Sequence, residues 1–219
     1  EETGEASAIR LAKEQTTLAT RQDRVSLLIM AAPSAFPFYR AYVRLAARSK
    51  PLAEVVARTD FFQFDDYPLH ADHPATFRHL LETQFFSHLR PLCPGVKVHP
   101  LNVDAPNPEQ VCREYTKQVL DAGPDLQLKG VGENGHWGFH EPGIPLDGAP
   151  AYIRVETSDE NAVQQLRDHP TLFRSADEVP RDAYTANVPL FLRTRVAIED
   201  NVPQASKAFA LLAGYGSDP

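Results

Sequence analysis

Short apolar runs of strand length alternate with segments of helical periodicity along most of this chain. The strand-like runs cover residues 25–30, 61–66, 126–130, 151–156 and 195–198. Segments with helical spacing of apolar residues, or with helix-forming composition, cover residues 7–22, 38–50, 74–89, 106–122, 160–167 and 204–213. Strands separated by helices of this length form βαβ units, so we predict one α/β domain with a mostly parallel sheet that is covered on both faces.

The overall charge and the distribution of apolar residues narrow the classes of function. The 219 residues carry a formal net charge of −7, which argues against nucleic-acid and membrane-surface binding because both favour a basic face. No apolar run approaches the ~20 residues that span a bilayer, and the acidic start lacks the basic and apolar regions of a signal peptide. Cys93 and Cys112 have neither metal nor redox spacing and are typical of a reducing compartment. We therefore predict a cytoplasmic protein that binds neither nucleic acid nor membrane.

Two of the predicted strands end in loops that are rich in polar residues. In parallel α/β sheets, ligands bind at the carboxyl ends of the strands, where such loops supply the polar groups. The first loop, residues 64–69, carries Asp65 and Asp66, whose side chains should point to opposite sides of an extended backbone. We therefore expect one carboxylate to face a ligand and the other to accept hydrogen bonds from the backbone. The second loop, residues 130–143, has the sequence GVGENGHWGFHEPG.

The second loop is compatible with several kinds of site. Its first six residues fit the spacing G-x-G-x-x-G, in which the third glycine of a dinucleotide-binding loop leads into a helix. His136 and His140 have the spacing of two metal ligands on one helical face. Gly138 and Pro142 oppose a helix in this segment, which disfavours both the dinucleotide and the metal interpretation. A glycine-rich turn that satisfies local backbone groups explains single residues, but not so many titratable groups in one loop.

An acid/base site is the interpretation that accounts for the whole loop. A histidine that is held by a nearby carboxylate transfers protons near neutral pH, because its ordinary pKa lies close to that range. A separate carboxylate could then remove a proton from carbon, and the aspartates of residues 64–69 are the obvious source. The sequence therefore predicts that the two loops meet to form one active site without a metal.

Several motifs resemble the glucosamine-6-phosphate deaminase (isomerase) family, which is related to the 6-phosphogluconolactonases. The string GENGHWGFHEPG resembles the family's G-x-[DN]-G-H-I-[AG]-F-N-E-P, and FDDY at residues 64–67 resembles its M-D-E-Y. HPATF at residues 73–77, followed by FFSH at 85–88, is similar to H-P-E-S-Y and F-F-D-H, and a late Lys-Ala pair begins at Lys207. The order and spacing agree from about Val25 to Lys207, whereas the residues that follow the histidine in the lactonases are not found here.

The resemblance implies a fold and an activity. The fold is a three-layer, Rossmann-like α/β sandwich, which we assign to residues 1–219 as one domain. The reaction is the conversion of glucosamine 6-phosphate to fructose 6-phosphate and ammonia, without a metal or organic cofactor. Asp65 would move a proton between C2 and C1, and His136 would handle the proton of the ring oxygen. Asn134 and Glu141 would orient that histidine.

The resemblance also implies a set of substrate contacts and a partner. The partner is a small-molecule sugar phosphate, and a homo-oligomer is left open. The residues expected to contact the substrate are Ser34, Asp66, Arg154 and Lys207. Three of these also have purely structural interpretations: Ser34 as a helix cap, Arg154 as the ion-pair partner of Glu156 or Asp159, and Lys207 as a surface residue.

Phosphate recognition is the point at which the chain departs from the family. The family's T-G-[GS]-T-P loop corresponds to AAPSA at residues 31–35, which has no glycine and a proline that lacks an N–H group. The sequence also stops at Pro219, short of the family's final strand and helices. Three functions therefore stay open, of which we favour the first: an amino-sugar-phosphate isomerase/deaminase, a family member acting on another sugar or sugar phosphate (lactonase-type hydrolysis included), and a degenerate, non-catalytic sugar-binding protein.

Overall fold

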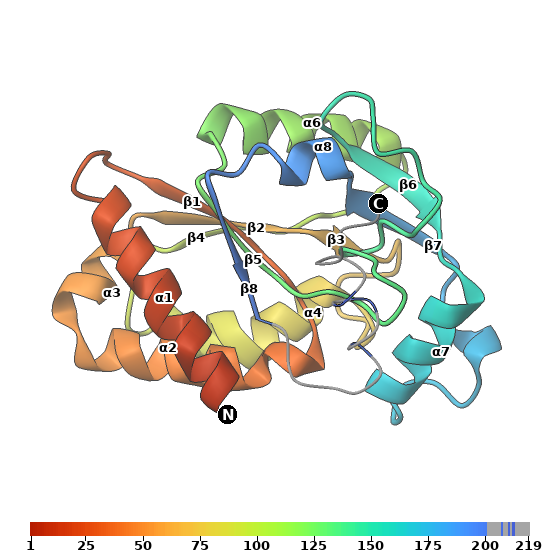
Figure 1. Cartoon of the computed structure of the whole chain (residues 1–219), viewed down its shortest axis with the longest axis horizontal. Helices are drawn as coiled ribbons and strands as arrows, with labels where there is room; N and C mark the ends of the chain where they lie inside the picture. The colour runs from red at the N-terminus through yellow and green to blue at the C-terminus, as the bar shows by residue number, and fades with distance from the viewer. Residues whose placement is uncertain (201–206, 208–209, 211, 213–219) are drawn as a thin grey trace.

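The computed structural model describes residues 1–200, 207, 210 and 212, and these form an α/β structure around a central parallel sheet (Figure 1). The sheet has five strands in the order β4-β2-β1-β5-β8, and every neighbouring pair is parallel. The strands are β1 (Val25–Ile29), β2 (Thr59–Gln63), β4 (Lys97–His99), β5 (Leu126–Lys129) and β8 (Val196–Glu199). The predicted fold class, with a mostly parallel sheet, is therefore confirmed.

Helices cover both faces of this sheet, which produces three layers. Figure 1 shows α1 and α2 on one face and α6 and α8 on the other. The two central strands, β1 and β5, are buried along their whole length because neither face reaches water, which explains the mostly apolar sequence of β1. The helices are α1 (Glu2–Leu18), α2 (Phe36–Arg48), α3 (Lys50–Val56), α4 (Phe77–Leu81), α5 (Ser87–Leu89), α6 (Pro108–Ala122), α7 (Asp159–Asp168) and α8 (Val188–Phe191).

The long helices lie close to their predicted positions because local signals mark their ends. In α6, the side chain of Asn107 accepts a hydrogen bond from the amide of Gln110, and Gly123 ends the helix with φ +67°. The helix predicted from residue 74 begins only at Phe77. It continues to Leu89 through a π-helical turn, Glu82–Phe86, and α5. The helix predicted over residues 204–213 lies mostly outside the described residues, and α3, β4 and α8 were not predicted.

A second, smaller sheet corrects two of the strand predictions. It is antiparallel, has the order β3-β7-β6, and is built from β3 (Asp65–Asp66), β7 (Asp182–Ala186) and β6 (Tyr152–Glu156). Residues 61–66 are therefore not one strand, because the chain leaves the parallel sheet after Gln63. Residues 151–156 also lie outside the parallel sheet. In β6, Tyr152 and Val155 are buried, whereas Arg154 and Glu156 are exposed, so the strand is only partly covered.

The carboxyl ends of the parallel strands bring three loops to the same edge of the central sheet. These loops follow β1, β2 and β5 and contain residues 30–35, 64–66 and 130–143. Ligand sites of open α/β folds occupy this position, so the structure supports the expected location of the site. In the described part of the chain, no helix combines the length and apolar character required to cross a membrane.

Candidate active site

A pocket opens where the three loops meet, and it is partly open to solvent. Its walls come from residues 30–34 after β1, Asp65 after β2, the loop after β5 with His136, the pocket side of α7, and Lys207. The structure thus brings together the two loops that the sequence predicted to meet.

His136 faces this pocket with its tautomer fixed by Asn134. The Nδ1 atom of His136 lies 2.6 Å from Oδ1 of Asn134, and the backbone amide of His136 donates to the same oxygen over 3.2 Å. The amide group of Asn134 is itself oriented, because its Nδ2 donates to Oε2 of Glu141 over 2.8 Å. An amide oxygen can only accept, so Nδ1 of His136 carries the hydrogen and Nε2 keeps a free lone pair.

Glu141 is the anchor of this chain of contacts. Its carboxylate is buried and accepts hydrogen bonds from Asn134, from the side chain of Asn161 over 2.6 Å, and from the hydroxyl and amide of Ser158 over 3.2 and 3.4 Å. Burial lowers the pKa of His136, and the negative charge of Glu141 opposes that effect only in part. The imidazole is therefore neutral near neutral pH and can accept a proton at Nε2.

Asp65 lines the same pocket, and its carboxylate has a raised proton affinity. Its side chain is 4% exposed, and burial raises its pKa well above the ordinary value, with a further contribution from the charge of Asp66. Within the described residues, no side chain or amide donates a hydrogen bond to the Asp65 carboxylate. A buried carboxylate with free oxygens and a raised pKa is suited to take a proton from carbon.

Two glycines of residues 130–143 lie so close to His136 and Asp65 that a larger residue would not fit. A Cβ atom at Gly132 would lie 2.1–2.4 Å from three atoms of the His136 ring. Gly138 has φ +59°, and a Cβ atom there would lie 2.9 Å from Oδ2 of Asp65 and 2.8 Å from Oγ1 of Thr185. The glycine spacing therefore reflects close packing against the predicted acid and base rather than a pyrophosphate.

The geometry of the loop does not support the dinucleotide interpretation. The segment after Gly135 contains turns, and the next helix, α7, begins only at Asp159. A dinucleotide fingerprint requires a helix directly after its third glycine. Among the described residues, no group of three or more His, Cys, Asp or Glu side chains could hold a metal ion.

Gly132→Ala should reduce turnover while the fold is retained. The added methyl group must displace the His136 ring, and a misplacement of ~1 Å can reduce the rate by about 10²-fold. Steady-state kinetics and thermal unfolding of this variant should be compared with those of Gly123→Ala. Gly123 has a positive φ, which Gly132 lacks, and no atom lies within 4 Å of a Cβ there, so that control carries backbone strain without touching the site. Parental kcat in Gly132→Ala would contradict the assigned position of His136.

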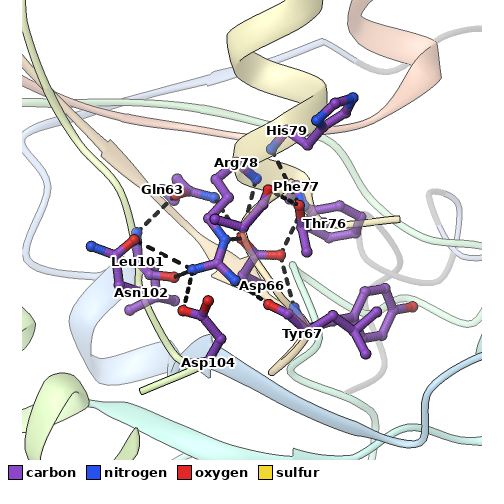
Figure 2. Close-up of polar contacts among 12 residues, drawn as sticks. Gln63, Asp66, Tyr67, Thr76, Phe77, Arg78, His79, Leu101, Asn102 and Asp104 are labelled. Carbon is purple, nitrogen blue, oxygen red and sulfur yellow. Dashed lines mark hydrogen bonds and ion pairs between the residues drawn. The ribbon is translucent and has the colours of Figure 1, made fainter. Parts of the chain in front are cut away.

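Asp66 is the carboxylate that accepts hydrogen bonds from the backbone, and its predicted substrate contact is wrong. Figure 2 shows it turned toward the start of α4. It accepts from the amides of Tyr67 and Phe77 over 2.8 Å and from that of Arg78 over 3.1 Å. Its side chain is 0% exposed and does not line the pocket. The prediction that the two aspartates point in opposite directions is confirmed.

Arg78 holds Asp66 and the neighbouring loops together. Its Nε atom lies 3.3 Å from Oδ2 of Asp66, and its Nη1 lies 2.8 Å from Oδ1 of Asp104 (Figure 2). The guanidinium also donates to the carbonyl oxygens of Leu69 and Leu101 and to the side chain of Asn102. We call Asp66, Arg78, Asn102 and Asp104 the arginine cluster. These contacts fix the backbone at Asp66, directly after Asp65.

The remaining predicted contacts divide into two groups. Arg154 does not line the pocket: it is exposed on β6, where Nη2 pairs with Oδ1 of Asp182 on β7 over 2.6 Å, so the predictions for Arg154 are wrong. Ser34 and Lys207 both line the pocket. Ser34 makes no helix-capping hydrogen bond, so it does not act as a helix cap. Lys207 is buried, so it is not a surface residue. Burial lowers the pKa of Lys207, and the negative charge of Asp168 opposes that effect.

The sequence did not point to the residues that α7 contributes to the pocket. Their side chains reach it because α7 packs beside the loop after β5, an arrangement that no motif or spacing encodes. They are Gln164, Gln165, Asp168 and His169, the last of which follows the helix directly.

Comparison with known protein families and sequences gives a consistent set of relatives. The family described as glucosamine-6-phosphate isomerases/6-phosphogluconolactonase matches residues 2–138. A glucosamine-6-phosphate deaminase of Shouchella clausii is 33% identical over 156 residues, which are 70% of this chain and 60% of that protein. A glucosamine-6-phosphate deaminase of Geobacillus sp. is 34% identical over 134 residues, or 60% of this chain and 50% of the other. The chain thus spans about half to three fifths of the length of these relatives.

Solved structures share the fold. A monomeric glucosamine-6-phosphate deaminase superimposes with a TM-score of 0.74 at 24% identity, covering 90% of this chain and 76% of the other. The 6-phosphogluconolactonase of Trypanosoma brucei superimposes with a TM-score of 0.72 at 16% identity, covering 99% and 84%. At these identities the likeness supports the architecture, and the chemistry has to be argued from the pocket.

Proposed function

The chain belongs to the glucosamine-6-phosphate isomerase/6-phosphogluconolactonase family, and on this basis we propose that it converts glucosamine 6-phosphate to fructose 6-phosphate and ammonia. The observation that carries the proposal is the joint presence of Asp65 and His136 in one pocket. One group is a carboxylate with raised proton affinity, and the other is a neutral imidazole with a free Nε2. Such a pair can move a proton on carbon and a proton on oxygen within one bound sugar.

His136 acts in the opening of the pyranose ring. The bond between C1 and the ring oxygen breaks, the C1 hydroxyl loses its proton to form the aldehyde, and the ring oxygen gains a proton. Nε2 of His136 takes the first proton and returns it to the ring oxygen. Asn134 and Glu141 keep Nδ1 protonated throughout, so that the exchange occurs only at the nitrogen that faces the sugar.

Asp65 acts in the isomerisation that follows. Its carboxylate removes the proton from C2, next to the C1 aldehyde, and O1 gains a proton from the ammonium group on C2, which leaves a neutral enolamine across C1 and C2. The same group returns the proton to C1, which places an iminium at C2. Water adds to that iminium and releases ammonia, which leaves the ketone of fructose 6-phosphate. The raised pKa of Asp65 brings its proton affinity closer to the working pH and so favours both transfers.

The phosphate would bind between Ser34 and Lys207. The Ser34 hydroxyl and the buried ammonium of Lys207 both line the pocket. The turn Pro33–Ala35, which leads into α2, also forms part of the pocket wall through Pro33 and Ser34. We therefore propose Asp65, His136, Asn134 and Glu141 as the acid/base machinery and Ser34 and Lys207 as phosphate contacts.

A second candidate is a family member that acts on a different sugar and depends less on phosphate. The observation that favours it is the carboxylate of Asp168, which lines the pocket and acts electrostatically on Lys207. A phosphate dianion would be repelled by this charge, and the turn at Pro33 offers one amide fewer than a glycine loop. Thermal-shift titrations with glucosamine 6-phosphate and with free glucosamine separate the two candidates, since a strict phosphate requirement would exclude the second.

The direct test of the proposed function measures ammonia and fructose 6-phosphate released from glucosamine 6-phosphate. We expect His136→Gln to reduce kcat by ~10²–10⁴-fold, the usual contribution of a positioned acid/base group. Because burial lowers the pKa of His136, protonation of Nε2 should reduce the parent's rate only below the ordinary histidine value of 6.5. Protonation of Asp65, whose pKa burial raises, adds to the fall of the rate toward acid pH. A variant with the parent's rate would contradict the role of His136.

We also propose a domain organisation and a binding partner for the chain. We propose that residues 1–219 form one domain, because a single cluster of buried apolar residues includes strands of both sheets, such as Leu28 of β1 and Tyr184 of β7. The proposed chemistry places a small sugar phosphate in the pocket as the partner, in a cytoplasmic setting.

A further inference from the structure

The first turn of α7 is bonded to the carboxylate that anchors the histidine. Nδ2 of Asn161 donates to Oε1 of Glu141 over 2.6 Å, and Asn161 is 1% exposed. The Ser158 hydroxyl donates to Oε2 of Glu141 over 3.2 Å while it also accepts from the Asn161 amide as the helix cap. Glu141 therefore lies at the positive end of the helix dipole of α7, where a carboxylate is stabilised.

Later residues of α7 hold the other end of the same loop. The side-chain oxygen of Gln164 accepts from the backbone amide of Glu133 over 3.0 Å. The guanidinium of Arg167 pairs with the carboxylate of Glu133 over 2.5 Å. Residues 133–141, with His136 between the two attachment points, are thus fastened to one helix at both ends.

We propose that Asn161 is a positioning residue for His136 and acts through Glu141 and Asn134. The amide group of Asn134 could rotate by half a turn, and the contact of its Nδ2 with a fixed carboxylate, together with donation from the His136 backbone amide to its Oδ1, makes its oxygen face Nδ1 of His136. Asn161 makes the shortest of the contacts that fix that carboxylate. The catalytic consequence of this role rests on the proposed function, whereas the structural role can be measured without it.

The same helix also lines the far wall of the pocket, through Gln164, Gln165 and Asp168. A ligand that contacts these residues therefore touches the same helix that holds Glu141 and so orients His136. Asn161 itself does not line the pocket, so its substitution should affect the rate of the bound complex rather than the strength of binding.

The test combines the tautomer of His136 with steady-state kinetics. Asn161→Asp replaces the donor amide with a carboxylate of the same shape facing Glu141, and Asn161→Ala removes the donor without adding charge. By ¹⁵N NMR without substrate, we expect the parent to hold the hydrogen on Nδ1 and both variants to show a mixture of tautomers. With substrate, kcat should fall by roughly 10–100-fold, the usual effect of a group that supports a site residue, while KM stays within about twofold.

Asn107→Asp is the matched control. It is the same substitution at the start of another helix, α6, and it keeps the oxygen that accepts from the Gln110 amide. It should leave both the tautomer and the kinetics unchanged. An unaltered His136 tautomer in both Asn161 variants would overturn the inference. An inactive parent with the expected NMR result would instead overturn the proposed function and leave the positioning role standing.

Discussion

Asp65→Asn is expected to reduce kcat by ~10²–10⁴-fold and, at neutral pH, to raise the melting temperature. The rate falls because an amide cannot take a proton from C2 of the sugar. The protein gains stability because the substitution removes a carboxylate that is buried without a hydrogen-bond donor among the described residues. A variant that is less active but more stable than the parent indicates that the parent residue serves the reaction and lowers the stability of the fold.

The pH dependence of the stability gain follows from the direction of the pKa shift. Burial raises the pKa of Asp65 in the folded protein well above its ordinary value of 3.8. As the pH rises through 3.8, the unfolded chain releases this proton more readily than the folded chain, so the parent loses stability relative to Asp65→Asn. Thermal unfolding from pH 4 to pH 8 should show the difference in melting temperature growing with pH.

Asp72→Asn is the control for Asp65→Asn, because the Asp72 side chain is 92% exposed. It should change neither the rate nor the melting temperature beyond error. Retained kcat in Asp65→Asn would remove Asp65 from the mechanism, and a melting temperature below that of the parent would show that its carboxylate is stabilised in the fold.

Arg78→Met should destabilise the fold by about 3–5 kcal/mol, the usual cost of removing one partner from a buried ion pair. Asp66 would remain fully buried without its cation, and Asp104, Asn102 and Leu69 would lose the group that joins their loops. The rate should fall as well, since the arginine cluster fixes the backbone beside Asp65. Denaturant unfolding at pH 7 measures the loss, and Arg40→Met, which removes an exposed arginine paired with Glu1, should cost little.

The charge on Asp66 gives this variant a distinctive pH profile. In the parent, burial raises the pKa of Asp66 to about 6, and the Arg78 charge opposes the rise. Without Arg78 the pKa rises further, so Arg78→Met should recover stability relative to the parent as the pH falls and Asp66 gains a proton. Adding Asp66→Asn should restore part of the loss at pH 7. Equal destabilisation at acid and neutral pH would show that the effect comes from packing alone.

The sequence predicted the central fold well where local chemistry determines it. The apolar run at 25–30 is typical of a buried strand in a covered sheet, and Asn107 and Gly123 mark the two ends of α6. The sequence could not tell which sheet a strand joins. Residues 151–156 form a strand as expected, yet their pairing with β7 depends on the path of the whole chain.

The candidate site also contains residues that the sequence could predict and residues that it could not. The side-chain alternation of an extended backbone correctly separated Asp65 from Asp66, and the family motif correctly brought His136, Asn134 and Glu141 together. Arg154 was misplaced because a strand residue faces either the pocket or the solvent according to the sheet it enters. The roles of Gly132 and Asn161 could not be predicted, since each depends on an atom that arrives from elsewhere in the loop or in the fold.

The most direct test of the central claim follows the C2 hydrogen of the sugar. Glucosamine 6-phosphate deuterated at C2 is incubated with the parent and with Asp65→Asn, and NMR monitors C2 and C1. If Asp65 moves this proton in the shared pocket, the parent will remove deuterium from C2 and deliver it to C1 of fructose 6-phosphate or to water. Asp65→Asn will leave it at C2. Deuterium that stays at C2 with the parent, or leaves at the same rate in both proteins, would contradict the proposed mechanism.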